Sequence, residues 1–296
     1  MLTLVIECFS ITRRPKVDSQ ELFERIAVLN FGLEGNKGLS YGSRIYSQDP
    51  NDAGSPGFRI SFKIEKDASS TVNKAEIRIY NLTSASRGLA ENPQNIIELF
   101  AGYGKEPKLL FRGNPSRVIS SVGGPDSVTV FEVGDGLKSF QDSRVDVSFK
   151  QGTPVTDVFQ TLTNAMGLDK GEQKDIPQKA FVSGLSLSGP VRDHMDYLTG
   201  KLDLEWSIQN GAVQIIPKGK STSQTAFLLS PETGLIGSPN KKDKGLEVVS
   251  LLQPEINPGR VVEIQSKFVN GQYRVEKVSH EGDTDDTAWF TRIEIS

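Results

Sequence analysis

The sequence predicts a mainly β protein in which two antiparallel β domains flank a small α/β domain. Apolar and polar residues alternate with a period of two between residues 58 and 133 and again after residue 246, a pattern typical of half-buried strands. Between these stretches, two segments carry apolar residues at helical spacing. The 28 glycines and 15 prolines are spread along the chain, as expected for many turns between strands.

Residues 1–40 differ from the rest and are predicted to be an N-terminal extension. A short helix is expected over residues 19–29, where four apolar residues have helical spacing: Leu22, Phe23, Ile26 and Leu29. Met1–Ile6 is apolar, but it lacks a basic flank and is followed by Glu7. It is therefore shorter than the roughly 7–15 apolar residues of a signal peptide. No segment approaches the ~20 apolar residues of a membrane-spanning helix, so a soluble, unprocessed chain is expected.

Residues 41–137 are predicted to form the first antiparallel barrel or sandwich. Its clearest strand runs from Phe58 to Glu65, and five more alternating segments follow at 75–80, 97–103, 109–112, 117–122 and 127–133. Turns are expected at Gly113-Asn-Pro and Gly123-Gly-Pro-Asp, and a short helix is expected after Asn81, because Thr and Ser cap helices well. Six closely spaced strands with turn signals indicate an antiparallel β domain.

Residues 138–220 are predicted to be an α/β insert with two similar helices. The first is expected to start at Thr153-Pro154, with Thr153 as N-cap, and the second at Gly189-Pro190. Their sequences match at an offset of 36 residues, which indicates a duplication or two helices packing on one sheet. After them, Asn210-Gly211 predicts a type I′ hairpin. That turn pairs Ile208 with Val213 and Trp206 with Ile215.

Residues 221–296 are predicted to form the second antiparallel β domain. Strands are expected at 246–252, 260–268 and 289–295, with an exposed loop at 237–245. A second Asn-Gly pair, Asn270-Gly271, predicts a hairpin that pairs Phe268 with Tyr273.

The sequence predicts no catalytic or metal-binding site. His194 lies beside Asp193 and Asp196 but is expected to border a helix core, since it takes the position of Val158 in the first helix. His280 is expected in a turn-like stretch followed by an acidic loop with Asp283, Asp285 and Asp286. The loop lacks the ligand spacing of an EF-hand, so a solvated loop is favoured over a cation site.

Nucleophile and phosphate motifs are also missing: there is no G-x-S-x-G, H-E-x-x-H or Walker sequence. The glycine clusters at 32–35 and 134–136 lack the strand-to-helix context of a phosphate site. Cys8, the single cysteine, cannot form an intrachain disulfide and is expected to pack. The loop Lys241-Lys242-Asp243-Lys244 is interpreted as solvated, and Trp206 and Trp289 as core residues. No cofactor is expected, and the formal net charge of −3 argues against a nucleic-acid binder.

Several segments resemble bacteriophage baseplate hub proteins, which are related to the spike-complex hub of type VI secretion. The resemblance spans about residues 58–296 in order, and its segments are 58–66, 73–82, 102–103, 110–113, 133–136, 230–239, 252–259 and 270–280. It implies two tube-type β-barrels, at 41–137 and 221–296, that flank the insert at 138–220.

The resemblance further implies a non-enzymatic homotrimer in the baseplate of a virion, synthesised in the host cytoplasm. Its six barrels would match the sixfold tail tube, and its threefold symmetry would match a spike or tip protein. The implied partners are tail tube, spike, tape-measure and other baseplate proteins, with DNA only in transit and no stable membrane association. Two alternatives remain open: a tail-associated peptidoglycan hydrolase, and a β-barrel module that binds carbohydrate or nucleic acid.

Overall fold

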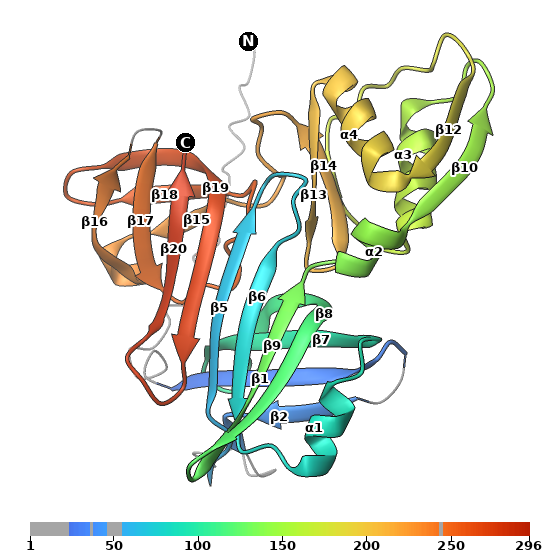
Figure 1. Cartoon of the computed structure of the whole chain (residues 1–296). Coiled ribbons are helices and arrows are strands. Elements are labelled where there is room, and N and C mark those ends of the chain that lie inside the picture. The colour runs from blue at the N-terminus through green and yellow to red at the C-terminus, as the bar shows by residue number, and fades with distance from the viewer. Residues whose placement is uncertain (1–23, 36–37, 46–54, 243–244) are drawn as a thin grey trace, which may run out of the picture.

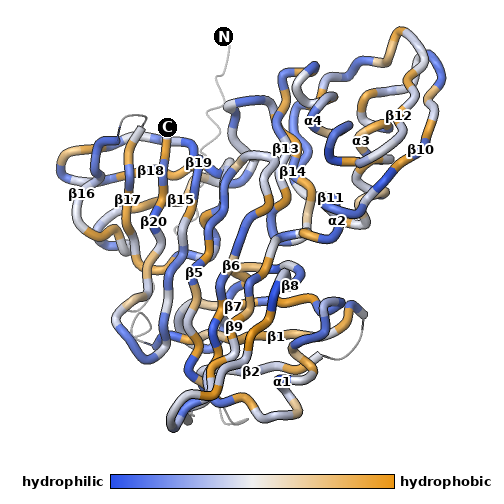
Figure 2. Tube along the Cα trace, in the orientation of Figure 1, coloured by the Kyte–Doolittle hydropathy of each residue, from blue (hydrophilic) through white to orange (hydrophobic). Residues whose placement is uncertain are grey.

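The computed structural model describes residues 24–35, 38–45, 55–242 and 245–296. Figure 1 shows a first β region (residues 25–134) at the bottom, an insert (137–217) at upper right and a second β region (227–295) at upper left. In Figure 2, hydrophobic and hydrophilic residues alternate along the long strands that join the two β regions. The prediction of a mainly β protein is confirmed, and the described helices α2, α3 and α4 all lie between residues 137 and 202.

The first β region contains nine strands and one short helix. Its elements are β1 (Arg25–Leu33), β2 (Leu39–Gly42), β3 (Arg44–Ile45), β4 (Ser55–Pro56), β5 (Ile60–Asp67), β6 (Lys74–Tyr80), α1 (Ser84–Ala90), β7 (Asn95–Tyr103), β8 (Lys108–Gly123) and β9 (Asp126–Gly134). The predicted short helix is confirmed as α1, where the Thr83 hydroxyl accepts a hydrogen bond from Ser86 N at 3.2 Å. The side chains that alternate inward along β5 and β6, from Ile60 to Ile79, are buried.

The helix predicted over residues 19–29 is wrong where the structure describes it. Residues 19–23 lie outside the described part, and Arg25–Leu33 is the strand β1. β1 pairs with β7 along its whole length, and Ala27, Leu29 and Phe31 face the core with a period of two. The apolar residues of this segment fit both the helical period of 3.6 and the strand period of two. Pairing with the long strand β7 selects the strand.

The turn predicted at Gly113-Asn-Pro is also wrong, because β8 runs through it as one long strand. The first part of β8 pairs with β7, and the part from Asn114 onward pairs with β9. A register shift at Pro115 absorbs the proline, which cannot donate a ladder hydrogen bond. The turn predicted at Gly123-Gly-Pro-Asp is confirmed as the tip of the β8–β9 hairpin.

The insert packs three helices and five strands around its own core. Its elements are α2 (Leu137–Asp142), β10 (Arg144–Phe149), α3 (Val155–Met166), β11 (Asp169–Gln173), β12 (Leu185–Pro190), α4 (Val191–Leu202), β13 (Leu204–Gln209) and β14 (Ala212–Pro217). The two similar helices are confirmed as α3 and α4, whose apolar faces are buried. Thr153 is not the N-cap, because Pro154 takes that position and the Thr153 hydroxyl donates to Lys150 O instead. Among the described residues, no helix is long and apolar enough to span a membrane.

The Asn210-Gly211 hairpin is confirmed in turn type and register. Both residues have positive φ, 55° and 82°, as a type I′ turn requires. Ile208 pairs with Val213 and Trp206 with Ile215.

The second β region repeats the alternating pattern around a smaller core. Its elements are β15 (Phe227–Leu229), a 3₁₀ turn η2 (Pro231–Thr233), β16 (Leu235–Lys241), β17 (Leu246–Leu251), β18 (Val261–Gln265), β19 (Asn270–Asp283) and β20 (Trp289–Ile295). The loop predicted at 237–245 is largely the strand β16. The hairpin predicted at Asn270-Gly271 is wrong in register, because Val262 pairs with Tyr273 and the chain turns at residues 266–269. Burial of Val262 and Ile264 in the core selects this pairing over the local turn preference.

The two β regions do not form separate closed barrels in the described residues. Pairing of β5 with β19, from Ser61 opposite Asp283 to Asp67 opposite Lys277, merges them into one open path of strands. The strand order is β16-β17-β20-β19-β5-β6-β9-β8-β7-β1-β2, with β15 and β18 branching from β19. Trp289 of β20 is buried in the core of the first β region, so the two regions share side-chain packing as well as a ladder.

Candidate functional site

The most distinctive polar site lies where the insert hairpin meets the two β regions. Both carboxylate oxygens of Asp135 accept backbone hydrogen bonds from the hairpin turn, from Asn210 N at 2.6 Å and Gly211 N at 2.7 Å. Two successive residues with positive φ point their N–H groups to the same side, which creates a concave anion site. An internal carboxylate fills that site, so Asp135 clamps the insert to the first β region.

Lys66 completes the clamp from the end of β5. Its ammonium donates to Asn210 Oδ1 at 2.9 Å and to Asn257 Oδ1 at 3.0 Å. Lys66 is 2% exposed and Asp135 is fully buried. One lysine therefore contacts the insert and the second β region while it belongs to the first, which makes this a three-way junction.

Burial shifts the acid–base behaviour of both groups. Burial lowers the pKa of Lys66 to about 8, and the charge of Asp135 opposes that shift. Burial also raises the pKa of Asp135, opposed by Lys66 and by the hairpin N–H groups. Buried groups with shifted pKa values often mark active sites, but here neither side chain is accessible to a substrate.

A second layer of amide hydrogen bonds holds the same hairpin. Asn73 Nδ2 donates to Ile208 O at 2.8 Å, and Gln209 Nε2 donates to Asp67 O at 2.9 Å. Asn73 Oδ1 in turn accepts from Asp67 N at 2.9 Å. Asn73 of the first β region thus bonds a carbonyl of the insert, and Gln209 of the insert bonds a carbonyl of the first β region. These reciprocal hydrogen bonds restrict both the separation and the orientation of the two elements.

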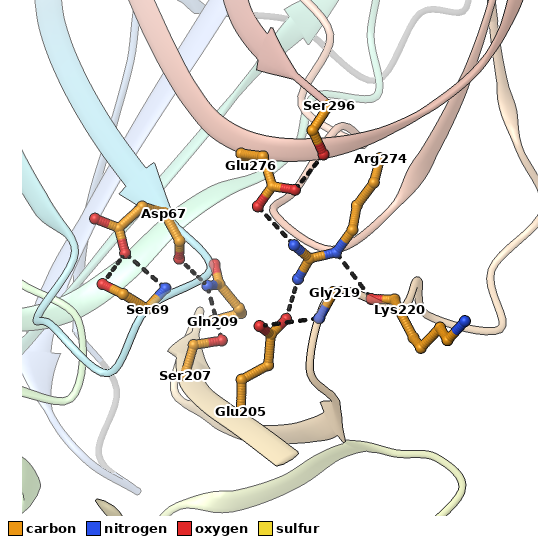
Figure 3. Close-up of polar contacts among 10 residues, drawn as sticks. All are labelled: Asp67, Ser69, Glu205, Ser207, Gln209, Gly219, Lys220, Arg274, Glu276 and Ser296. Carbon is orange, nitrogen blue, oxygen red and sulfur yellow. Dashed lines mark hydrogen bonds and ion pairs between the residues drawn. The ribbon is translucent and has the colours of Figure 1, made fainter. Parts of the chain in front are cut away.

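Arg274 ties the other end of the hairpin to the second β region, as Figure 3 shows. Its guanidinium is 8% exposed and donates to Glu205 of β13, to Glu276 Oε2 at 2.5 Å and to Lys220 O at 2.8 Å. Burial raises the pKa of Glu205, and the charge of Arg274 opposes that rise. Because the guanidinium binds two carboxylates and a carbonyl in fixed directions, it restricts the orientation of the hairpin relative to the second β region.

A cleft of about 670 Å³ lies along this junction, and four of the five acidic side chains that line it are hydrogen-bonded within the protein. Glu205 and Glu276 bind Arg274, Asp196 accepts from Trp206 Nε1 at 2.7 Å, and Asp67 accepts from Ser69 N at 2.8 Å. In the part of the chain that the structure describes, no group of three or more His, Cys, Asp or Glu side chains could hold a metal ion. The arrangement suits mechanical connection of the three parts.

The two histidines occupy different environments. His194 is half-buried on α4, next to the insert core, as expected. His280 is not in a turn: it is fully buried in β19, with Nδ1 2.9 Å from Thr291 Oγ1. The acidic loop after it is confirmed as exposed at Asp285 and Asp286, and Asp283 pairs with Arg59 at 2.7 Å.

The remaining sequence candidates do not meet at a common site. Lys241 belongs to β16, and Lys242 pairs with Glu247 at 2.6 Å and Glu294 at 2.9 Å. Trp206 and Trp289 are each 2% exposed, so their interpretation as core residues is confirmed. Cys8, Asp243 and Lys244 lie outside the described residues. Gly32 belongs to β1, and Gly35 lies two residues after the end of that strand.

Sequence reasoning missed Lys66 and Asp135, although both left a signal. Lys66 continues the inward series of Phe62 and Ile64, so a charge stands at a core position. Asp135 lies in the noted Gly134-Asp-Gly136 cluster, where Gly136 has a φ of 58°. Neither sequence signal predicts which residues the side chain contacts.

His280 leads to a prediction about acid stability. Burial and the charge of Lys66 lower its pKa well below the usual value. Below about pH 6.5 the unfolded chain binds a proton that the folded chain does not, so stability falls with falling pH. We expect His280→Gln to reduce this slope by up to ~1.4 kcal/mol per pH unit between pH 5 and 6.5. Urea unfolding at a series of pH values measures it, and equal slopes in both proteins would contradict it.

No protein-family model matches the chain, and no curated protein matches its sequence. Solved structures do match at low identity. A 43 kDa tail protein of prophage MuSo2 from Shewanella oneidensis has a TM-score of 0.59 at 8% identity, over 92% of this chain and 96% of that chain. A tail protein from Neisseria meningitidis MC58 has a TM-score of 0.57 at 8% identity, over 91% and 96%.

The E. coli c3393 protein matches with a TM-score of 0.51 at 9% identity, over 80% of this chain and 73% of that chain. That protein is described as a component of the type VI secretion system with structural similarity to the T4 tail proteins gp27 and gp5. The resemblance to phage tail and type VI secretion proteins is thereby confirmed at the level of the fold. The chain has the fold of phage tail proteins that a type VI secretion component shares.

Proposed function

We propose that this chain is a structural protein of a phage tail and forms the trimeric hub of the baseplate. The observation that carries the proposal is a match to a prophage tail protein over 92% of this chain and 96% of that one. The similarity thus includes both β regions and the insert. Each subunit would contribute two β regions, so that three subunits present six of them to a sixfold tail tube.

The junction between the three parts supports a structural role. Lys66, Asp135 and Arg274 hold the three parts together through buried charged groups, which fixes the angle between them. A ring closes only if each subunit keeps the same shape. The proposed partners are the tail tube protein, a spike or tip protein, tape-measure and other baseplate proteins, with DNA only in transit. The proposed location is the baseplate of the virion, after synthesis in the host cytoplasm.

We also propose that the protein is not an enzyme. The cleft carboxylates Glu205 and Glu276 bind Arg274, so neither is free to act as the paired acid and base of a hydrolase. The buried Trp206 and Trp289 offer no stacking platform for a sugar or a base. A cell-wall zymogram separates these functions, since a cleared band would support the hydrolase.

The trimer leads to a direct prediction. We expect the purified protein at micromolar concentration to have about three times the chain mass of 32.4 kDa, measured by native mass spectrometry and light scattering. Electron microscopy of purified tails should place it at the tip. A strictly monomeric protein that is also absent from purified tails would overturn the proposal.

A further inference from the structure

A lysine amine and two carboxamides meet inside the junction. Lys66 Nζ lies 2.9 Å from Asn210 Oδ1 and 3.0 Å from Asn257 Oδ1. Lys66 is 2% exposed, and its Nζ lies 5.8 Å from the centre of the Phe111 ring, which is fully buried. The amine is therefore held against carboxamide groups in surroundings that exclude bulk water.

The reactive atoms of Lys66 and Asn210 are close enough to form a bond. A carbonyl bond is ~1.23 Å long, so Asn210 Cγ lies within ~4.2 Å of Lys66 Nζ. Attack on a carbonyl carbon requires a separation of ~3–3.5 Å, so a shift of less than ~1 Å brings the two atoms into position. The type I′ turn fixes the backbone of Asn210, at a φ of 55°, and thereby holds its carboxamide beside the amine.

Burial makes the amine of Lys66 a better nucleophile. A lysine attacks only as the neutral amine, and desolvation favours that form. Burial lowers the pKa of Lys66 to about 8, against the opposing charge of Asp135. At pH 7 roughly a tenth of the molecules therefore carry the neutral amine, compared with less than about a thousandth for an exposed lysine.

Asp135 is placed to carry the protons of such a reaction. Its side chain is fully buried and accepts a hydrogen bond from Asn210 N at 2.6 Å, so the carboxyl group lies beside the residue that would be attacked. Its charge also acts on Lys66. Burial raises the pKa of Asp135, and a carboxyl group with a raised pKa can take up a proton and return it.

We propose that Lys66 and Asn210 react with each other to form an isopeptide bond, an amide between the two side chains. Asp135 takes a proton from the Lys66 ammonium, and the neutral Nζ attacks Asn210 Cγ. The Nζ–Cγ bond forms and the Cγ–Nδ2 bond breaks. Two protons pass in all from Nζ to the leaving nitrogen through the Asp135 carboxyl group, and that nitrogen departs as an ammonium ion. The reaction needs no oxidant, reductant or other reactant.

The bond joins the first β region to the insert within one chain. Asn257 accepts a hydrogen bond from Nζ and so orients the amine toward Asn210. Each chain reacts once and converts no substrate, which agrees with a protein that is not an enzyme. The proposal rests on the geometry of the junction and stands whether or not the chain is a tail hub.

Mass spectrometry of the denatured full-length protein measures the bond. We expect a mass lower than that of the 296-residue sequence by one ammonia. Trypsin does not cleave after a lysine whose amine is acylated, so residues 64–74 should remain uncut at Lys66 and be joined to residues 202–218. A succinimide at Asn210 loses the same ammonia but leaves the two peptides separate. Separate peptides, or a link to residues 245–260 instead, overturn the proposal.

Two variants remove one reacting group each and keep the turn. Asn210→Gly retains the positive φ but has no carboxamide, and Asp135→Asn keeps an acceptor oxygen but cannot carry a proton. We expect no cross-linked peptide in Asn210→Gly. In Asp135→Asn we expect cross-linking slowed by ~10²-fold or more, followed by mass spectrometry with time after cell-free synthesis.

Asn270→Gly is the matched control, because it changes the other Asn-Gly pair of the chain, at the start of β19. It should keep both the loss of ammonia and the joined peptides. Circular dichroism confirms that each variant is folded. Loss of ammonia that persists in Asn210→Gly, or cross-linking of Asp135→Asn at the rate of the unmodified protein, contradicts the proposed reaction.

Discussion

Asp135→Ala is expected to lower the free energy of unfolding by ~3–5 kcal/mol, the range for breaking a buried charged pair by removing one partner. The change removes the acceptor of two backbone N–H groups, Asn210 N and Gly211 N. It also leaves the ammonium of Lys66, which is 2% exposed, without its neighbouring negative charge. Both effects act at a junction where all three parts of the chain meet.

Equilibrium denaturation in urea measures the loss, with Asp142→Ala as the control. Asp142 is an exposed carboxylate at the end of α2, so its removal should change stability by less than ~0.5 kcal/mol. Asp135→Asn keeps one acceptor oxygen and should fall between the two. A drop below ~1 kcal/mol for Asp135→Ala would show that the clamp contributes little to the junction.

Trp289→Ala is expected to cost ~3–5 kcal/mol, as for other large aromatic side chains removed from a core. Trp289 belongs to β20 but is 2% exposed in the core of the first β region, with its ring 5.5 Å from that of Phe62. The alanine leaves a cavity at the seam between the two β regions. We therefore expect loss of stability together with faster amide exchange in β5 and β19.

Phe268→Ala is the matched control, because its aromatic side chain is 73% exposed at the turn between β18 and β19. It should change the free energy of unfolding by less than ~0.5 kcal/mol. Thermal unfolding followed by circular dichroism compares the two variants under one condition. Equal effects of the two substitutions would show that the seam does not depend on Trp289.

Sequence patterns predicted the elements whose geometry depends on residues that are close together in the chain. The alternation from Phe58 to Glu65 predicted β5, and the paired apolar faces predicted α3 and α4. The Asn210-Gly211 hairpin was predicted to the exact residue pair, because its turn requires two residues with positive φ.

Other elements were mispredicted where a distant partner outweighed the local signal. Apolar spacing suggested a helix through Ile26 and Leu29, but pairing with β7 makes that segment a strand. Asn270-Gly271 has the same turn preference as Asn210-Gly211, yet the buried side chains of β18 shift the register away from it. The free energy that such a turn preference contributes is smaller than the free energy gained by burying two or three core side chains.

The sequence by itself determined the mainly β class of the fold, the two similar helices and the residues that face inward along most strands. Only the tertiary structure decided that β5 pairs with β19, which merges two expected barrels into one sheet. It also decided that Lys66, Asp135 and Asn257 meet at one junction. The reason is physical: every strand offers the same backbone donors and acceptors. The choice of partner therefore depends on which faces and charges become buried together, and these come from residues far apart in the chain.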